Sequence, residues 1–132
     1  MISGGLASLM LSAASAEVAP DGSTVRPLLA LEQGSVAHFE LPPRTVARAV
    51  AHRTVGEIWY ILGGRGEMWR KLDAEEEIIG LQAGLCLALP AGSRFQFRCF
   101  GDEPLSALGV TMPRWPGPDE ALEVEGPWTA TV

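Results

Sequence analysis

The chain has 132 residues, a formal net charge of −6 at pH 7 and a hydrophobic fraction of 47%. This length indicates one domain with a substantial core. The negative charge argues against nucleic acid as a partner, because phosphate binding needs clustered Lys and Arg. No stretch approaches the roughly 18 uninterrupted apolar residues of a membrane-spanning helix, so no membrane partner is expected.

Residues 1–19 are predicted to form an N-terminal arm. Residues 2–16 are small and apolar and end in Ala14-Ser15-Ala16, the pattern of a secretory cleavage site. The first Lys or Arg is Arg26, however, so the positively charged start of a signal peptide is missing. We therefore expect a cytoplasmic protein whose arm packs on the body of the molecule or on a partner subunit.

Short apolar segments then follow at even spacing between turns rich in Gly and Pro, with almost no helical period. The predicted strands cover residues 25–31, 36–41, 45–53, 57–62, 67–72, 77–81, 85–89, 95–100 and 105–112. The segment 85–89 is continuously apolar, which predicts a strand that is covered on both faces. Taken together, the pattern favours an all-β sandwich or barrel.

The last segment, residues 113–132, is rich in Pro and Trp and is predicted to lack regular structure. Its tryptophans are expected either to cap a pocket or to pack on the barrel or on a second subunit. The two cysteines, Cys86 and Cys99, lie in apolar runs and are expected to be buried free thiols.

Two spaced motifs lie in the centre of the chain. In the first, four residues separate His52 from Glu57, and six more separate Glu57 from Gly64. In the second, five residues separate Gly84 from the Pro90-Ala91-Gly92 turn. With these spacings, residues 20–112 resemble the cupin superfamily. The resemblance implies a double-stranded β-helix, or jelly-roll barrel, with a pocket inside one end and frequent homodimers. Cupin functions range widely, so the fold does not name a reaction.

The resemblance also assigns metal ligands to four positions, which hold Val50, His52, Glu57 and Phe95 here. Cupins bind a divalent transition metal through three imidazoles and one carboxylate. Only His52 and Glu57 could ligate a metal, and Phe95 would crowd the ion. A rival alignment makes Thr54 the second histidine position, but it leaves two residues rather than four before Glu57. The resemblance therefore implies either no cofactor or a weakly bound divalent transition metal.

The resemblance and the strand alternation together predict a pocket within the barrel. Its expected lining is Arg48, Val50, His52, Thr54, Glu57, Trp59, Phe95 and Phe97. Arg48 shares a predicted strand face with His52, where it could bind a carboxylate or phosphate; a solvated surface position is the alternative. Trp59 forms either a pocket wall or ordinary core. His38 is expected to be a surface or structural histidine rather than a metal ligand.

We predict a homodimeric barrel that binds a small organic molecule in an aromatic pocket. Two alternatives stay open. In the first, the protein is a metal-dependent isomerase or dioxygenase that uses His52 and Glu57. In the second, it is a metal-free enzyme in which the same two side chains act as an acid–base pair. Whether the protein is an enzyme is therefore left open by the sequence.

Overall fold

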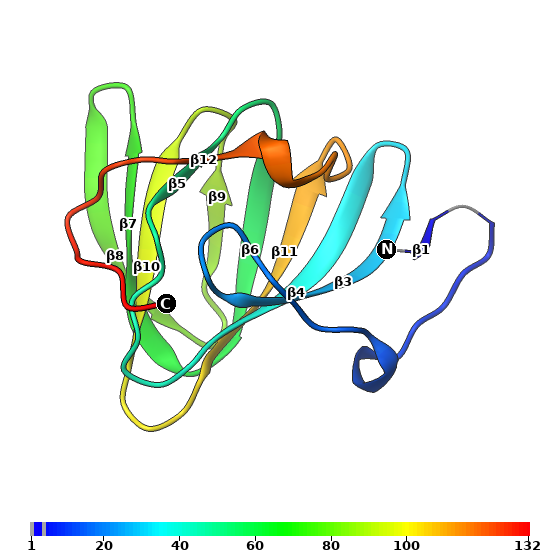
Figure 1. The fold of residues 1–132 in the computed structure, drawn as a ribbon, viewed down its shortest axis with the longest axis horizontal. Helices are drawn as coiled ribbons and strands as arrows, with labels where there is room; N and C mark the ends of the chain where they lie inside the picture. The colour runs from blue at the N-terminus through cyan, green and yellow to red at the C-terminus, as the bar shows by residue number, and fades with distance from the viewer. Residues whose placement is uncertain (1, 4) are drawn as a thin grey trace.

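The computed structural model describes residues 2, 3 and 5–132, and the regular secondary structure within them is almost entirely β-strand (Figure 1). Two 3-10 helices, η1 (Leu11–Ala13) and η2 (Pro118–Glu120), interrupt it. The strands are β1 (Ile2–Ser3), β2 (Glu17–Val18), β3 (Thr24–Leu31), β4 (Gly34–Leu41), β5 (Val50–His52), β6 (Gly56–Gly63), β7 (Arg65–Leu72), β8 (Glu75–Gln82), β9 (Cys86–Leu89), β10 (Arg94–Phe100), β11 (Leu105–Met112) and β12 (Ala121–Glu123). The predicted all-β class is confirmed.

The strands form two sheets. The larger sheet has the order β1-β3-β4-β11-β6-β9, with β2 also paired to β3, and the smaller has the order β12-β5-β10-β7-β8. All pairs are antiparallel except β1 with β3. From β4 onward the chain passes repeatedly from one sheet to the other, so the sheets face each other as a jelly-roll barrel (Figure 1).

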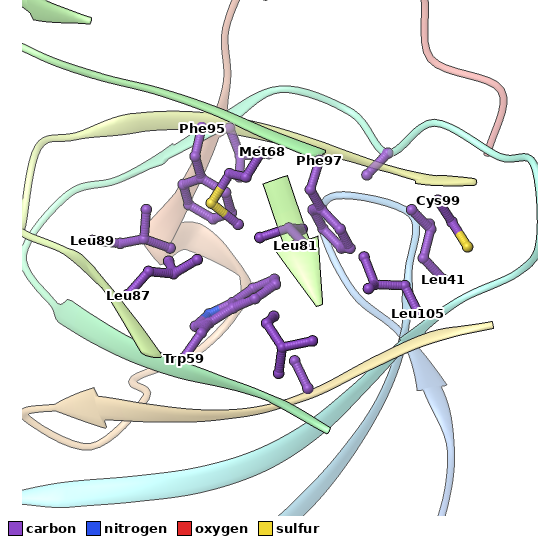
Figure 2. Packing of buried hydrophobic residues seen from close by; sticks show 14 residues of the cluster. Leu41, Trp59, Met68, Leu81, Leu87, Leu89, Phe95, Phe97, Cys99 and Leu105 are labelled. Atoms are coloured by element: carbon purple, nitrogen blue, oxygen red, sulfur yellow. The ribbon is translucent and has the colours of Figure 1, made fainter. Parts of the chain in front are cut away.

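The core lies between the facing sheets because the side chains of each strand alternate in direction. On β6, for example, Trp59 and Ile61 are buried whereas Ile58, Tyr60 and Leu62 are exposed. Figure 2 shows Trp59 rising from β6 toward Phe95 and Phe97 of β10, in the opposite sheet. The apolar cluster around them consists of Leu41, Ala47, Val50, Trp59, Ile61, Met68, Leu81, Leu87, Leu89, Phe95, Phe97, Cys99, Leu105 and Ala107.

The glycine of the first motif has a steric role at the β6–β7 turn. Gly64 has a φ of 81°, a conformation that favours glycine. A Cβ at this position would also lie 2.3 Å from the carbonyl oxygen of Pro104. Glycine therefore allows the turn to lie directly against the start of β11.

Three details of the predicted strands are wrong. Of the predicted strand 45–53, only Val50–His52 is a strand. The Arg48 N–H donates to the Asp21 carbonyl at 2.8 Å, and before it the pairing with β10 is reduced to the single bridge between Val46 and Arg98. The segment 85–89 is covered on one face only, because Leu87 and Leu89 face the core whereas Cys86 and Ala88 face outward and are exposed. Cys86 is consequently exposed, whereas Cys99 is buried, and both are free thiols.

The C-terminal segment also departs from its prediction, because it contains η2 and β12. In β12, Ala121 lies opposite His52 and Glu123 opposite Val50, so this segment extends the smaller sheet. It continues beside β10, where the Trp128 N–H donates to Gln96 Oε1 at 3.1 Å. The Arg98 guanidinium lies 4.0 Å from the centre of the Trp128 ring. The Pro/Trp segment thus packs on the barrel.

Within the N-terminal arm, β1 and β2 pair with β3, whereas residues 5–16 between them are mostly exposed and lie away from the barrel (Figure 1). Leu6 is 108% exposed and Met10 is 74% exposed. Positions 1 and 4, which the predicted arm includes, lie outside the described residues. The homodimer, in which a partner subunit would cover such an arm, stays a prediction. Within the described part of the chain, no helix has the length and apolarity needed to cross a membrane.

Candidate functional site

A cavity of about 410 Å³ lies between the two sheets. Its aromatic lining comes from β4, β6, β10 and the segment after β11, through Phe39, Trp59, Phe95 and Trp115 respectively. Residues Glu17 to Asp21, which comprise β2 and the following turn, form another part of its wall. The cavity therefore uses both sheets and both terminal segments.

The structure brings together most of the residues predicted to line a pocket. Those that line the cavity are Val50, His52, Glu57, Trp59 and Phe95. Arg48, Thr54 and Phe97 do not. Arg48 is exposed, and its Nε donates to the Val132 carbonyl at 3.1 Å. The reason is the irregular backbone before Val50, which breaks the strand alternation that placed Arg48 inside.

The other two misplaced residues have separate explanations. Thr54 is exposed beyond the end of β5, where its backbone N–H donates to Glu120 Oε1 at 2.8 Å. Phe97 is 2% exposed and lies in the core, with its ring centre 5.0 Å from that of Trp59. Neither residue therefore reaches the cavity, although Phe97 supports its aromatic wall from behind.

The four positions that the cupin resemblance assigns to metal ligands meet in this cavity. Phe95 lies opposite Val50 in the β5–β10 pair, and its ring centre is 5.3 Å from that of His52. Among the described residues, no three His, Cys, Asp or Glu side chains are grouped so that they could hold a metal ion. The side chains present thus do not fit the three-imidazole, one-carboxylate ligand set. Whether a metal is absent or weakly bound stays a prediction.

The two histidines occupy different environments. His38 is 6% exposed, lies outside the cavity lining, and has an Nδ1 atom 3.9 Å from Glu40 Oε1. His52 lines the cavity and packs edge-on against Trp115, with ring centres 5.1 Å apart. Burial lowers the pKa of His52 to about 4, and the nearby Glu120 carboxylate only partly opposes this effect. His52 is therefore neutral at neutral pH.

Glu57 is the buried acid of the cavity. It is 4% exposed and forms no ion pair with any described residue. It also forms no hydrogen bond with His52. Burial raises the pKa of Glu57 to about 7; the Trp59 indole N–H opposes this rise, and the Asp21 carboxylate adds to it. A carboxyl with this pKa changes protonation state near neutral pH, which is the range where general acids and bases operate.

Gly109 of β11 leaves room for the side chains around Glu57. A Cβ at this position would lie 2.8 Å from Phe39 Cε2, 3.2 Å from Glu57 Oε2 and 3.3 Å from Trp59 Nε1. The buried Trp59 Nε1–H lies near enough to Glu57 to oppose the rise in its pKa, although it makes no hydrogen bond of normal geometry in the described part of the chain. The side chains of Phe39, Glu57 and Trp59 can lie this close together because Gly109 has no side chain of its own.

Several polar groups of the cavity were not predicted. Asp21 accepts hydrogen bonds from the Ser23 N–H at 2.9 Å and the Ser23 hydroxyl at 2.5 Å. The hydroxyls of Ser35 and Thr111 bond to each other, and Ser35 Oγ also accepts the Trp115 N–H at 2.9 Å. Ser35 and Thr111 face each other across the β4–β11 pair, a register that no local sequence pattern reveals. For Phe39, by contrast, the alternation along residues 36–41 was an available signal.

Glu120 holds the C-terminal segment against the cavity. Its carboxylate accepts hydrogen bonds from the N–H groups of Thr54, at 2.8 Å, and Val55, at 3.1 Å, as well as from the Thr54 hydroxyl. Its carbonyl accepts the Arg53 N–H at 2.9 Å. Burial alone would raise the pKa of Glu120, but these hydrogen bonds outweigh it and the pKa is lowered. Glu120 therefore stays ionised and keeps Pro118 in the cavity wall.

Comparison with known proteins places the chain in a family. The family model described as "Cupin domain" matches residues 37–111. This chain belongs to the cupin domain family. No curated protein matches the chain. The residues that match include both motifs and nine of the twenty residues that line the cavity, while Asp21, Trp115 and Glu120 lie outside the matched range.

Solved structures share this cupin fold at low identity. A double-stranded β-helix protein from Klebsiella pneumoniae is 16% identical, with a TM-score of 0.65 over 79% of this chain and 85% of its own. Oxalate decarboxylase from Bacillus subtilis is 15% identical, with a TM-score of 0.73 over 92% of this chain and 34% of its own. Streptomyces PAC13, solved with uridine, is 9% identical, with a TM-score of 0.73 over 92% of both chains.

The Glu120 contacts predict a stability effect at the C-terminal segment. Replacing Glu120 by Ala leaves the N–H groups of Thr54 and Val55 without their acceptor. We expect the free energy of unfolding to fall by about 1–3 kcal/mol, measured by urea denaturation. Asp119→Ala, at the exposed neighbouring position, is the matched control and should change stability by less than about 0.5 kcal/mol. Equal effects of the two substitutions would contradict this role of Glu120.

The raised pKa of Glu57 predicts a pH dependence of stability. The protonated Glu57 side chain contributes fully to the stability of the folded state below the ordinary glutamate pKa of 4.5. This contribution is lost as the pH rises through about 7, because the buried group must then ionise. Glu57→Gln removes this cost. We expect the variant to be more stable than the natural protein by on the order of 3 kcal/mol at pH 8, with the difference shrinking toward pH 5.

The measurement is urea unfolding at both pH values. Glu123→Gln removes the same charge from an exposed site on β12 and should show no such pH-dependent difference. If the stability difference between Glu57→Gln and the natural protein is no larger at pH 8 than at pH 5, Glu57 ionises freely in the folded state.

Proposed function

We propose that the protein binds a small organic molecule in the cavity between its sheets. The observation that carries this proposal is a space of about 410 Å³ bounded by aromatic rings and a buried carboxyl group. Ligand sites in proteins typically have volumes of about 300–1,000 Å³, a mostly apolar wall and few polar groups. The cavity has each of these properties.

The arrangement of the wall supports the same proposal. Phe39 and Trp115 are only partly buried, so their rings offer contact area to a guest molecule. Glu57 and the Ser35–Thr111 hydroxyl pair supply a small number of polar atoms that would orient it. Uridine in the PAC13 structure illustrates that a barrel of this shape can hold a small molecule, although at 9% identity the likeness extends to the fold alone.

Filling the cavity should abolish this binding. Ala37 lines the cavity on β4, so Ala37→Phe adds a ring to the space that the ligand would occupy. In a thermal-shift and NMR screen of small organic compounds, we expect hits to stabilise the natural protein and to lose at least tenfold in affinity in this variant. Ala83→Phe places the same ring on an exposed turn after β8 and should leave affinity unchanged. Equal binding to both variants would locate the site elsewhere.

A second candidate function is a metal-free enzyme, and the state of Glu57 favours it. With its pKa near 7, the Glu57 carboxyl could take a proton from a bound molecule and return it. This candidate differs from the predicted His52–Glu57 pair, because the neutral His52 is influenced by Glu120 instead. Glu57 alone would act as the acid and base.

Conversion of a bound compound to product distinguishes the enzyme from the protein that only binds a ligand. If Glu57 moves a proton, a compound found in the binding screen should be converted to product with a rate that depends on a group of pKa near 7. Glu57→Gln should reduce that rate by roughly 100-fold or more, and a chelator should leave it unchanged. Binding with no conversion of any hit would favour the binding function alone.

A further inference from the structure

We propose that the cavity binds an organic cation, namely a protonated amine or quaternary ammonium carried by one or two rings. This inference rests on the proposed function and specifies its ligand. It follows from one juxtaposition: the acidic residues Glu17, Asp21 and Glu57 line a space that is also walled by aromatic rings, and the described residues that line it include no Lys or Arg.

The charges of the wall select against anions. Three acidic residues line the cavity, and the arginine predicted to bind a carboxylate or phosphate, Arg48, donates to the Val132 carbonyl instead. A bound anion would lose its water shell and find no Lys or Arg among the described lining residues, which is unfavourable in a space of low polarity. An ammonium group in the same place would be attracted by the acidic side chains.

Glu57 is the carboxyl group that lacks a counter-charge. Burial raises the pKa of Asp21, and two hydrogen bonds from Ser23 and then the positive charge of Arg48 oppose this rise. Glu57 lies 4% exposed and forms no ion pair with any described residue. A buried acid is stabilised in its charged form when a cation lies within a few ångströms. The ligand's ammonium group would be that cation.

The aromatic walls suit the rest of such a ligand. Phe39 stacks on Trp59 with ring centres 5.2 Å apart and an interplanar angle of 14°, so one face of Phe39 is covered by Trp59. Phe39 is nevertheless partly exposed and lines the cavity, as does Trp115. Aromatic faces attract cations and also pack against apolar rings. A ring bearing a short aminoalkyl group would satisfy both kinds of contact.

The experiment compares three ligands of similar shape: benzylamine, benzyl alcohol and benzoate. Their affinities are measured at pH 8 by NMR titration. We expect benzylamine to bind at least about tenfold more tightly than benzyl alcohol, and benzoate to bind most weakly. Glu57→Gln should lower the benzylamine affinity about tenfold while changing the benzyl alcohol affinity less than about twofold. Glu123→Gln is the charge-matched control and should change neither.

The outcomes separate the ligand class from the proposed function. If benzyl alcohol or benzoate binds as tightly as benzylamine, or if Glu57→Gln affects amine and alcohol equally, the cation proposal is overturned. The proposed function then survives, provided that Ala37→Phe abolishes the binding. If Ala37→Phe leaves benzylamine binding intact, or if none of the three compounds binds, both the ligand class and the site are overturned.

Discussion

The packing of Trp59 between the two sheets is the contact on which both the core and the cavity depend. Trp59 is 1% exposed, and its ring meets the edges of Phe95 and Phe97 at centre distances of 6.0 and 5.0 Å. A ring of this size sets the spacing of the facing sheets. Phe39 stacks on the same indole, so Trp59 both closes the core and forms the wall of the cavity beside it.

The electrostatic character of the site follows from this packing. Glu57 lies two residues before Trp59 on β6, so strand alternation turns both side chains to the same buried side. Water is excluded there, which penalises the charged form of the acid and brings its pKa to about 7. The related barrels include an oxalate decarboxylase and a protein solved with uridine, so the shared fold leaves function to side chains such as these.

Strand alternation explains which parts of the site could be predicted. It correctly placed Val50, His52, Glu57 and Trp59 at the cavity, because each lies in a regular strand. It failed for Arg48, because the Arg48 N–H donates to the Asp21 carbonyl and the regular pairing with β10 is interrupted there. It could not find Trp115 or Glu120, whose positions depend on contacts with residues more than 60 positions away in the sequence.

The sequence by itself determined the all-β class, the cupin motifs and the loss of two ligand positions to Val50 and Phe95, because these depend on residue type and short-range spacing. The tertiary structure decided which other side chains line the cavity where the two ligand positions are lost. It brought Asp21 to one wall and Trp115 to another, and it left Glu57 without a positive partner in the described chain. Burial and the neighbours of a charge are properties of the packed molecule, so no local pattern could contain them.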